Sequence, residues 1–214
     1  MNTLLKILLL CSISLGAWAH EEVALDKVIL ETDVKSVERG AEAMIGSCHA
    51  CHSMKYMHYR DLLSYGMDKQ KVESWRGDQP LDSAIMAQMS ENDAIASFGK
   101  APPDLSLMVK AREGGANYLY SYLLGYYLTK EGVAGNHFYP ETKMPDVLNV
   151  SSIAEGASHS EVQAQARDIV SFLSWVADPH AEERLHLGYY VIVYLLILTI
   201  LLYFVKKQVW AGLK

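Results

Sequence analysis

The sequence predicts an all-α exported domain, with loop insertions, that is followed by one transmembrane helix. Apolar residues recur with helical spacing in several segments, whereas the alternating pattern of β-strands is weak throughout. Residues 188–205 form a run of 18 residues without a charge, long enough for one membrane span. The first 19 residues have the layout of a secretion signal. We therefore divide the chain into a signal peptide at 1–19, an exported domain at 20–187, a transmembrane helix at 188–205 and a short tail at 206–214.

The two apolar ends of the chain predict its topology. Lys6 precedes an apolar run that is too short to span a bilayer, and Ala17-Trp18-Ala19 resembles a cleavage site. Lys206 and Lys207 follow the longer run near the C-terminus. Because positive charge stays on the cytoplasmic side, the tail is expected in the cytoplasm and the domain before the span outside it.

The exported domain is expected to be acidic. The chain has 19 Lys and Arg against 25 Asp and Glu, and setting aside Lys6 and the three lysines after the span leaves 15 against 25, or about −10. Such a balance argues against nucleic acid or anionic lipid as partners and favours a basic protein, through steered encounter. Ordinary solubility charge would give the same balance.

The exported domain is expected to consist of helices that are joined by loops. Residues 132–140 are a Gly-rich irregular loop, residues 69–98 read as an acidic insertion of loops and short helices, and residues 180–186 read as a charged linker. The tyrosines of 117–128 are typical of a packed core with polar tips. The expected helices are 34–45, 56–63, 107–112, 117–128 and 158–178.

Directly after the first of these helices, residues 48–52 read Cys-His-Ala-Cys-His, the attachment sequence of a c-type haem. Cys48 and Cys51 are spaced to add across the two vinyl groups of one haem, His52 is placed to bind its iron, and His49 is expected to be a spacer. A zinc site would need further ligands, and a thioredoxin-like or disulfide pair gives His52 no role. Cys11 lies in the signal peptide. We predict one haem c, held covalently through Cys48 and Cys51.

A haem that only carries electrons needs a second axial ligand, because an open position invites oxygen or peroxide chemistry. Met54 and Met57 lie too near the motif to reach the opposite face of the haem. Met144 follows the irregular loop and precedes Pro145, so its thioether can be presented from a fixed, extended backbone. We predict Met144 as this ligand, with His137 as the rival on ligand chemistry alone.

With these residues assembled, the chain resembles the cytochrome c1 family, the haem c subunits of cytochrome bc1 complexes. The matching blocks occur in family order: SVERG, CHACHSMKYMHYRDL, APPDLSLMVKAREGGANYLYSYLLGY, KMP, RDIVSFLSWVADP and a C-terminal anchor. Cys-x-x-Cys-His alone would indicate only a c-type cytochrome. The PPDLS block, the Arg-x-Gly-Gly segment and the anchor together single out this family.

The resemblance implies a role for each site residue. Cys48 and Cys51 hold the haem, and His52 and Met144 are its proximal and distal ligands. The three remaining residues complete the pocket: Pro103 lines it, Arg112 faces a propionate and Tyr118 lies beside that propionate. One departure concerns the distal block, where Asp146 and Val147 follow Pro145 in place of the family's further prolines.

The resemblance also implies partners and a location. Cytochrome b and the Rieske iron-sulfur protein would share a complex with the chain in the bacterial inner membrane, with the haem domain in the periplasm. The Rieske protein would donate one electron and a c-type cytochrome would accept it, without catalytic acid or base residues on this chain. Two other functions stay open: an independent membrane-anchored electron carrier, and a haem-based sensor or peroxidase, against which Met144 argues.

Overall fold

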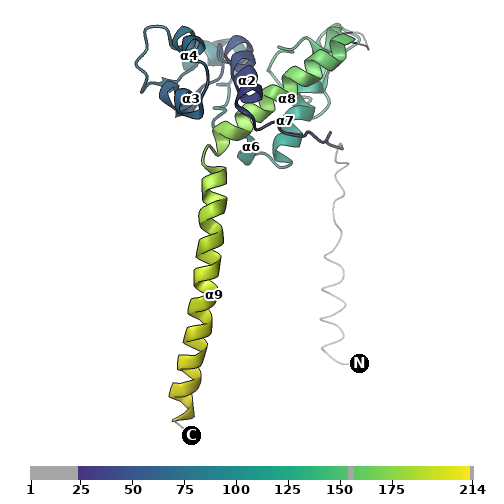
Figure 1. Ribbon diagram of the computed structural model, residues 1–214. Coiled ribbons are helices and arrows are strands. Elements are labelled where there is room, and N and C mark those ends of the chain that lie inside the picture. The colour runs from purple at the N-terminus through teal and green to yellow at the C-terminus, as the bar shows by residue number, and fades with distance from the viewer. Residues whose placement is uncertain (1–23, 154–156, 213–214) are drawn as a thin grey trace, which may run out of the picture.

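Two long helices cross at the centre of the head in the computed structural model, which describes residues 24–153 and 157–212 (Figure 1). They are α2 (Val34–Ser47) and α8 (Ala157–Ala177). At Gly40 the two backbones approach so closely that an added Cβ would lie 2.0 Å from the carbonyl oxygen of Asp168. Arg39 binds the Asp168 carboxylate with two nitrogens, at 2.7 and 3.2 Å. The crossing therefore fixes the direction in which α2 delivers the residues that follow it.

Helix α2 confirms the expected helix at 34–45. The Asp33 side chain caps its first turn by accepting a hydrogen bond from the Ser36 N–H at 3.1 Å. Val37, Ala41 and Met44 recur with helical spacing and are at most 1% exposed. The predicted signal peptide at 1–19 lies outside the described residues.

The segment after the motif begins as a strand, so the helix expected at 56–63 is partly wrong. β1 (Met54–His58) pairs antiparallel with β2 (Ala84–Ile85), and α3 (Tyr59–Tyr65) starts only after it. The partner strand lies far away in the sequence, which is why local periodicity misses it. Residues 69–98 are loops and short elements as expected, with α4 (Lys69–Arg76) and α5 (Glu91–Phe98).

The middle of the chain forms two helices and a hairpin. α6 (Met108–Ala111) is one residue shorter at each end than the helix expected at 107–112. α7 (Gly115–Leu124) starts two residues before the helix expected at 117–128 and ends four residues before its expected end. The chain leaves α7 for a hairpin of β3 (Tyr126–Leu128) and β4 (Ala134–Asn136), and a short 3₁₀ helix, η2 (Val150–Ser152), precedes α8. Gly114, with φ of 81°, is the N-cap residue of α7 and adopts a left-handed conformation that favours glycine.

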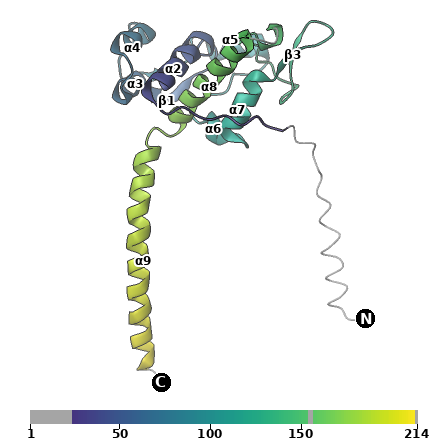
Figure 2. The ribbon, with the colours of Figure 1, turned by 45° about the vertical axis from the view of Figure 1, so that its right-hand side comes forward.

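Residues 24–33 form an extended strap across the head (Figure 2). Its backbone is held by side chains of the head: the Asp26 N–H donates to Ser121 Oγ at 2.8 Å and the Val28 N–H to Asn117 Oδ1 at 3.0 Å. The acceptors both lie on α7, so the strap covers that helix.

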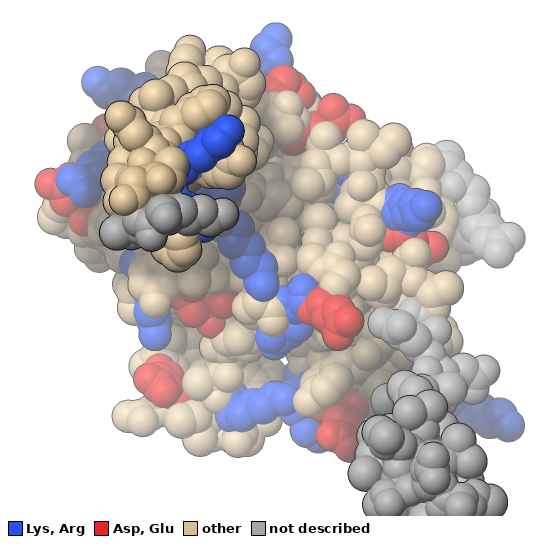
Figure 3. All heavy atoms as spheres, turned by 90° about the horizontal axis from the view of Figure 1, so that it is seen from below, with Lys and Arg blue, Asp and Glu red and all other residues tan. Residues whose placement is uncertain are grey.

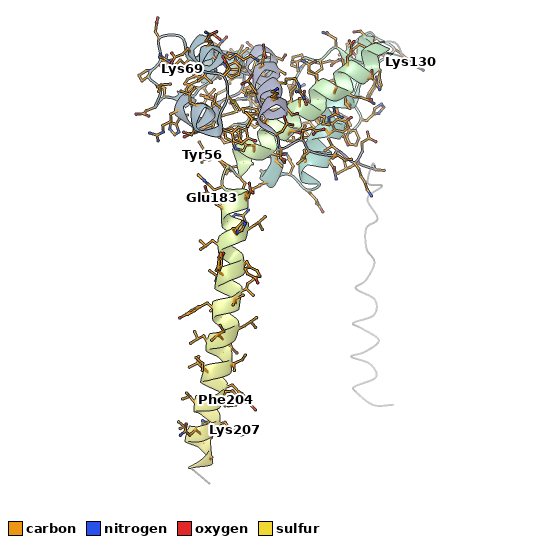
Figure 4. All side chains as sticks on the ribbon, in the orientation of Figure 1. Tyr56, Lys69, Lys130, Glu183, Phe204 and Lys207 are labelled. Atoms are coloured by element: carbon orange, nitrogen blue, oxygen red, sulfur yellow. The ribbon has the colours of Figure 1, made fainter. Side chains whose placement is uncertain are left out.

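A long exposed helix, α9 (Ala181–Ala211), leaves the head and contains the predicted span 188–205. Among the described residues it is the one helix long and apolar enough to cross a membrane. Glu183 lies at its head end and Lys207 near its far end (Figure 4). The charged linker expected at 180–186 is helical from Ala181 onward, because α9 already begins there. The mainly helical fold is confirmed.

Candidate functional site

A cavity of about 450 Å³ lies inside the head, a size typical of ligand sites. Leu119 and Leu123 of α7 and Ile169 and Leu173 of α8 contribute apolar walls. Every residue that the sequence predicted for the site lines this cavity: Cys48, Cys51, His52, Pro103, Arg112, Tyr118 and Met144. Segments nearly a hundred residues apart in sequence are thus brought to one place.

The two thiols come from a single turn at the end of α2. The Cys48 carbonyl accepts hydrogen bonds from the N–H groups of Cys51, at 3.1 Å, and His52, at 2.9 Å. The two cysteines do not form a disulfide with each other, so both sulfurs are available for other bonds. Burial raises the pKa of the Cys48 thiol to about 11, and the nearby Cys51 adds to this rise. The turn therefore presents the Cys48 thiol in its neutral form at the cavity wall.

His52 is held as a metal-binding tautomer. Its Nδ1 lies 2.7 Å from the carbonyl oxygen of Pro103. Because a carbonyl only accepts, Nδ1 carries the proton and Nε2 keeps its lone pair for a metal. Burial lowers the pKa of His52, against the opposing effect of the Pro103 hydrogen bond, so the imidazole is neutral at neutral pH.

The Pro103 carbonyl is in turn fixed by the residues that follow it. Asp104 Oδ2 accepts a hydrogen bond from the Lys55 N–H at 2.8 Å, and the fully buried Ser106 Oγ accepts one from the Tyr56 N–H at 3.1 Å. Neither side chain caps α6, whose N-cap residue is Leu107. They tie the proline segment to β1, directly after His52.

His49 does more than the spacer expected from the sequence. It is 6% exposed, and its Nε2 lies 2.7 Å from the carbonyl oxygen of Met86. The backbone adds two bonds, from the Gln88 N–H to the His49 carbonyl and from the Met89 N–H to the Ala50 carbonyl. The insertion thus covers the outer side of the attachment turn. No local signal in the sequence indicates this contact.

On the distal side, Asp146 holds the segment in which the family usually has further prolines. Its carboxylate accepts hydrogen bonds from the N–H groups of Val150, at 3.0 Å, and Ser151, at 2.7 Å. This caps η2 and fixes the chain directly after Met144-Pro145. A side-chain cap thereby stiffens a segment that further prolines would otherwise stiffen.

The rival ligand His137 is not among the residues that line the cavity. Its ring is exposed and stacks on Tyr127, with centroids 4.3 Å apart. The structure adds another methionine to the cavity wall, Met108, which is 7% exposed. Met108 starts α6 only five residues after Pro103, on the segment that holds His52. Its placement therefore favours a packing role and leaves Met144 as the distal candidate.

Cations stand at the edge of the cavity. Arg112 is exposed and lines it together with Lys100 and Lys143. The Lys100 Nζ lies 5.3 Å from the ring centroid of Tyr139. Burial raises the pKa of Tyr118, opposed by the Arg112 charge, so Tyr118 is a neutral hydrogen-bonding group here. Cations beside an apolar cavity suit a ligand that is apolar in its body and anionic at one edge.

These residues fit a covalently held haem. The cavity supplies thiols at the right spacing, a neutral imidazole, a thioether, apolar walls and cations for propionates. Within residues 24–153 and 157–212 no group of three or more His, Cys, Asp and Glu could form a metal site without haem. Fold and site together define a membrane-anchored c-type cytochrome.

Residues 23–213 match the Cytochrome C1 family, and the chain therefore belongs to the cytochrome c1 family. Cytochrome c1 of Allochromatium vinosum is 31% identical, over 83% of this chain and 84% of that protein. The ammonia monooxygenase gamma subunit of Nitrosomonas europaea is 29% identical over 97% of both chains. A chain of a solved hyperthermophilic respiratory Complex III, 20% identical, has the same fold, with a TM-score of 0.51 and 99% of both chains covered. As a family member, the chain carries haem c and is an electron-transport subunit of the bc1 type.

Proposed function

We propose that this chain passes single electrons from a Rieske iron-sulfur protein to a c-type cytochrome, in a complex that also contains cytochrome b. The observation that carries the proposal is the cavity, which gathers thiols, an imidazole and a thioether from separate segments. When bound, haem supplies reversible one-electron chemistry. The chain's own residues hold it, exclude water from it and set its potential.

Each residue of the cavity has a part in this proposal. Cys48 and Cys51 hold the group covalently, and His52, with its Nδ1 proton on Pro103, offers Nε2 as the proximal ligand. Met144 offers its sulfur as the distal ligand. A thioether disfavours ferric iron, and apolar walls disfavour the extra charge of the oxidised state. Both effects raise the potential, which suits a carrier late in a respiratory chain.

The proposed location follows from the two ends of the chain. Helix α9 anchors the head, and the lysines beyond residue 205 favour a cytoplasmic tail. Together with the signal predicted at 1–19, these charges support a head in the periplasm, on the inner membrane. The underside of the head carries Lys and Arg interspersed with Asp and Glu (Figure 3). This is the side from which α9 leaves the head (Figure 1), so in the proposed arrangement it faces the membrane.

A second assignment is favoured by one comparison. The relative described as an ammonia monooxygenase gamma subunit aligns over 97% of both chains. An anchored cytochrome that serves a membrane enzyme other than a quinol oxidoreductase would have the same cavity and the same anchor. The proteins that remain bound to the chain after gentle extraction distinguish the two assignments.

The ligand assignment is tested by replacing Met144 with Leu. Met144→Leu is expected to keep covalent haem and to lower its potential, because the thioether is lost while the attachment turn is untouched. Met108→Leu is the matched control, since it removes the other methionine that lines the cavity and should leave the potential unchanged. Redox titration of the purified proteins measures both. An unchanged potential in Met144→Leu, or a comparable drop in Met108→Leu, would overturn the assignment.

A further inference from the structure

The backbone of Met144 is held on both sides by a ring of hydroxyl groups. The Met144 N–H donates to Thr142 Oγ1 at 3.2 Å, and the Tyr126 hydroxyl donates to the Met144 carbonyl at 3.1 Å. Tyr122 joins the two, because its hydroxyl oxygen lies 2.6 Å from Thr142 Oγ1 and 3.2 Å from the Tyr126 hydroxyl oxygen. Four residues therefore close one hydrogen-bonded ring around the proposed distal ligand.

Every hydrogen-bond donor in this ring can have an acceptor at the same time. The Tyr126 hydroxyl has one proton to donate. The Met144 carbonyl can only accept a hydrogen bond, whereas the Tyr122 hydroxyl can either donate or accept one. The Tyr126 hydroxyl must therefore donate its proton to the Met144 carbonyl, and rotation of the other hydroxyl groups in the ring cannot supply this bond. Tyr122 and Thr142 can each donate to the next oxygen around the ring. Such closed networks strengthen their members mutually.

The position of Tyr126 is itself fixed by its surroundings. It is 5% exposed and starts β3, where it pairs with Asn136 of β4. Asn136, fully buried, donates from Nδ2 to the Tyr122 carbonyl at 2.8 Å. The Tyr126 hydroxyl lies 3.1 Å from the Met144 carbonyl oxygen, and because a carbonyl only accepts, the hydroxyl is the donor of this bond. The hairpin thus presents a rigid donor to the loop that carries Met144.

We propose that Tyr126 is a positioning residue that holds the Met144 backbone so that its sulfur stays in place on the haem iron. The inference rests on the proposed role of Met144 as distal ligand. Without the Tyr126 hydroxyl the Met144 carbonyl loses its buried donor, and the loop gains freedom to turn the thioether away from the cavity. The haem attachment at Cys48 and Cys51 is untouched by this change.

The test is Tyr126→Phe in the full-length haem protein, with Tyr127→Phe as the matched control. Tyr127 is the next residue of the same strand, and its ring stacks on His137. Ligation is followed by the weak far-red absorption that thioether sulfur gives on ferric haem, and by titration with imidazole, which competes with Met144. We expect Tyr126→Phe to bind imidazole roughly three- to tenfold more tightly than wild type, the loss of about one hydrogen bond. Tyr127→Phe should match wild type.

A second variant tests the same ring from the other side. Thr142→Val keeps the shape of the side chain but removes the oxygen that accepts the Met144 N–H. It should increase imidazole affinity in the same direction as Tyr126→Phe. If both variants bind imidazole as wild type does, while Met144→Leu abolishes the far-red absorption, the positioning role is refuted and the ligand role stands. If wild type lacks that absorption and Met144→Leu changes nothing, the ligand role itself is wrong.

Discussion

His52 and Met144 reach the cavity by opposite means. His52 is placed by the turn that it shares with Cys48 and Cys51, and needs only the Pro103 carbonyl to fix its tautomer. Met144 is held by Tyr126, eighteen residues away, on one side and by the Asp146 cap, two residues further along the chain, on the other. Spacing in the sequence thus specifies the proposed proximal ligand, whereas tertiary contacts help to place the proposed distal one.

This difference sets what the sequence could predict at the residue scale. Cys48, Cys51 and His52 follow from chemistry that requires one fixed spacing. Tyr126 and Asn136 could not be found in this way, because each acts on a partner that is brought near only by folding. Their sequence neighbourhood reads as an ordinary tyrosine-rich helix end and a glycine-rich loop.

Replacing Cys51 with Ala tests the covalent attachment. Cys51→Ala removes one of the two thioether links, so haem stain on denaturing gels should fall strongly. Cys11→Ala should stain normally, because Cys11 belongs to the predicted signal peptide. Undiminished stain in Cys51→Ala, with two thioether links found by peptide mass analysis, would contradict the assignment.

At the scale of elements, the crossing of α2 and α8 is the joint that fixes the attachment turn. Helical periodicity predicted both helices, because each buries one apolar face along its length. The same method missed β1 with β2 and β3 with β4, since these short strands owe their form to cross-strand partners. It also cannot reveal why a glycine stands in the middle of α2.

Two glycines of α2 make a matched pair for testing the crossing. Gly40→Ala should destabilise the head by about 3 kcal/mol, near the upper end for overpacking, because its Cβ would meet the backbone of Asp168. A Cβ added at Gly46 would have no neighbouring atom within 4 Å, so Gly46→Ala should stabilise the helix by about 0.5–1 kcal/mol. Urea unfolding of the purified haem protein gives both values. Equal midpoints for the two variants would show that the crossing tolerates a wider separation.

At the scale of the whole molecule, an ion-pair joint connects the head to its anchor. Asp178 lies between α8 and α9 and accepts a hydrogen bond from Lys110 of α6 at 2.7 Å, and it also pairs with Arg184 of α9. Lys110 first, and then Arg184, lower the pKa of the Asp178 carboxyl. The joint is therefore intact at neutral pH and is lost only as the pH falls through that lowered pKa. It favours one orientation of the head above the membrane.

The composition of the whole chain predicted less about partners than its motifs did. A formal charge of about −10 on the exported domain suggested a uniformly basic partner, yet the cavity edge carries Arg112, Lys100 and Lys143. Net charge sums the charges of all faces of the protein and does not show how folding distributes them. Only the arrangement of the head on its anchor shows which charges face a given partner.

The most direct test of the bc1 assignment is gentle detergent extraction of the native protein, followed by a reduced-minus-oxidised spectrum and protein identification. We expect a c-type haem band together with b-type haem and an iron-sulfur protein, in fixed proportion. A c-type band alone, or one accompanied by a different membrane enzyme under conditions that preserve such complexes, would contradict the account.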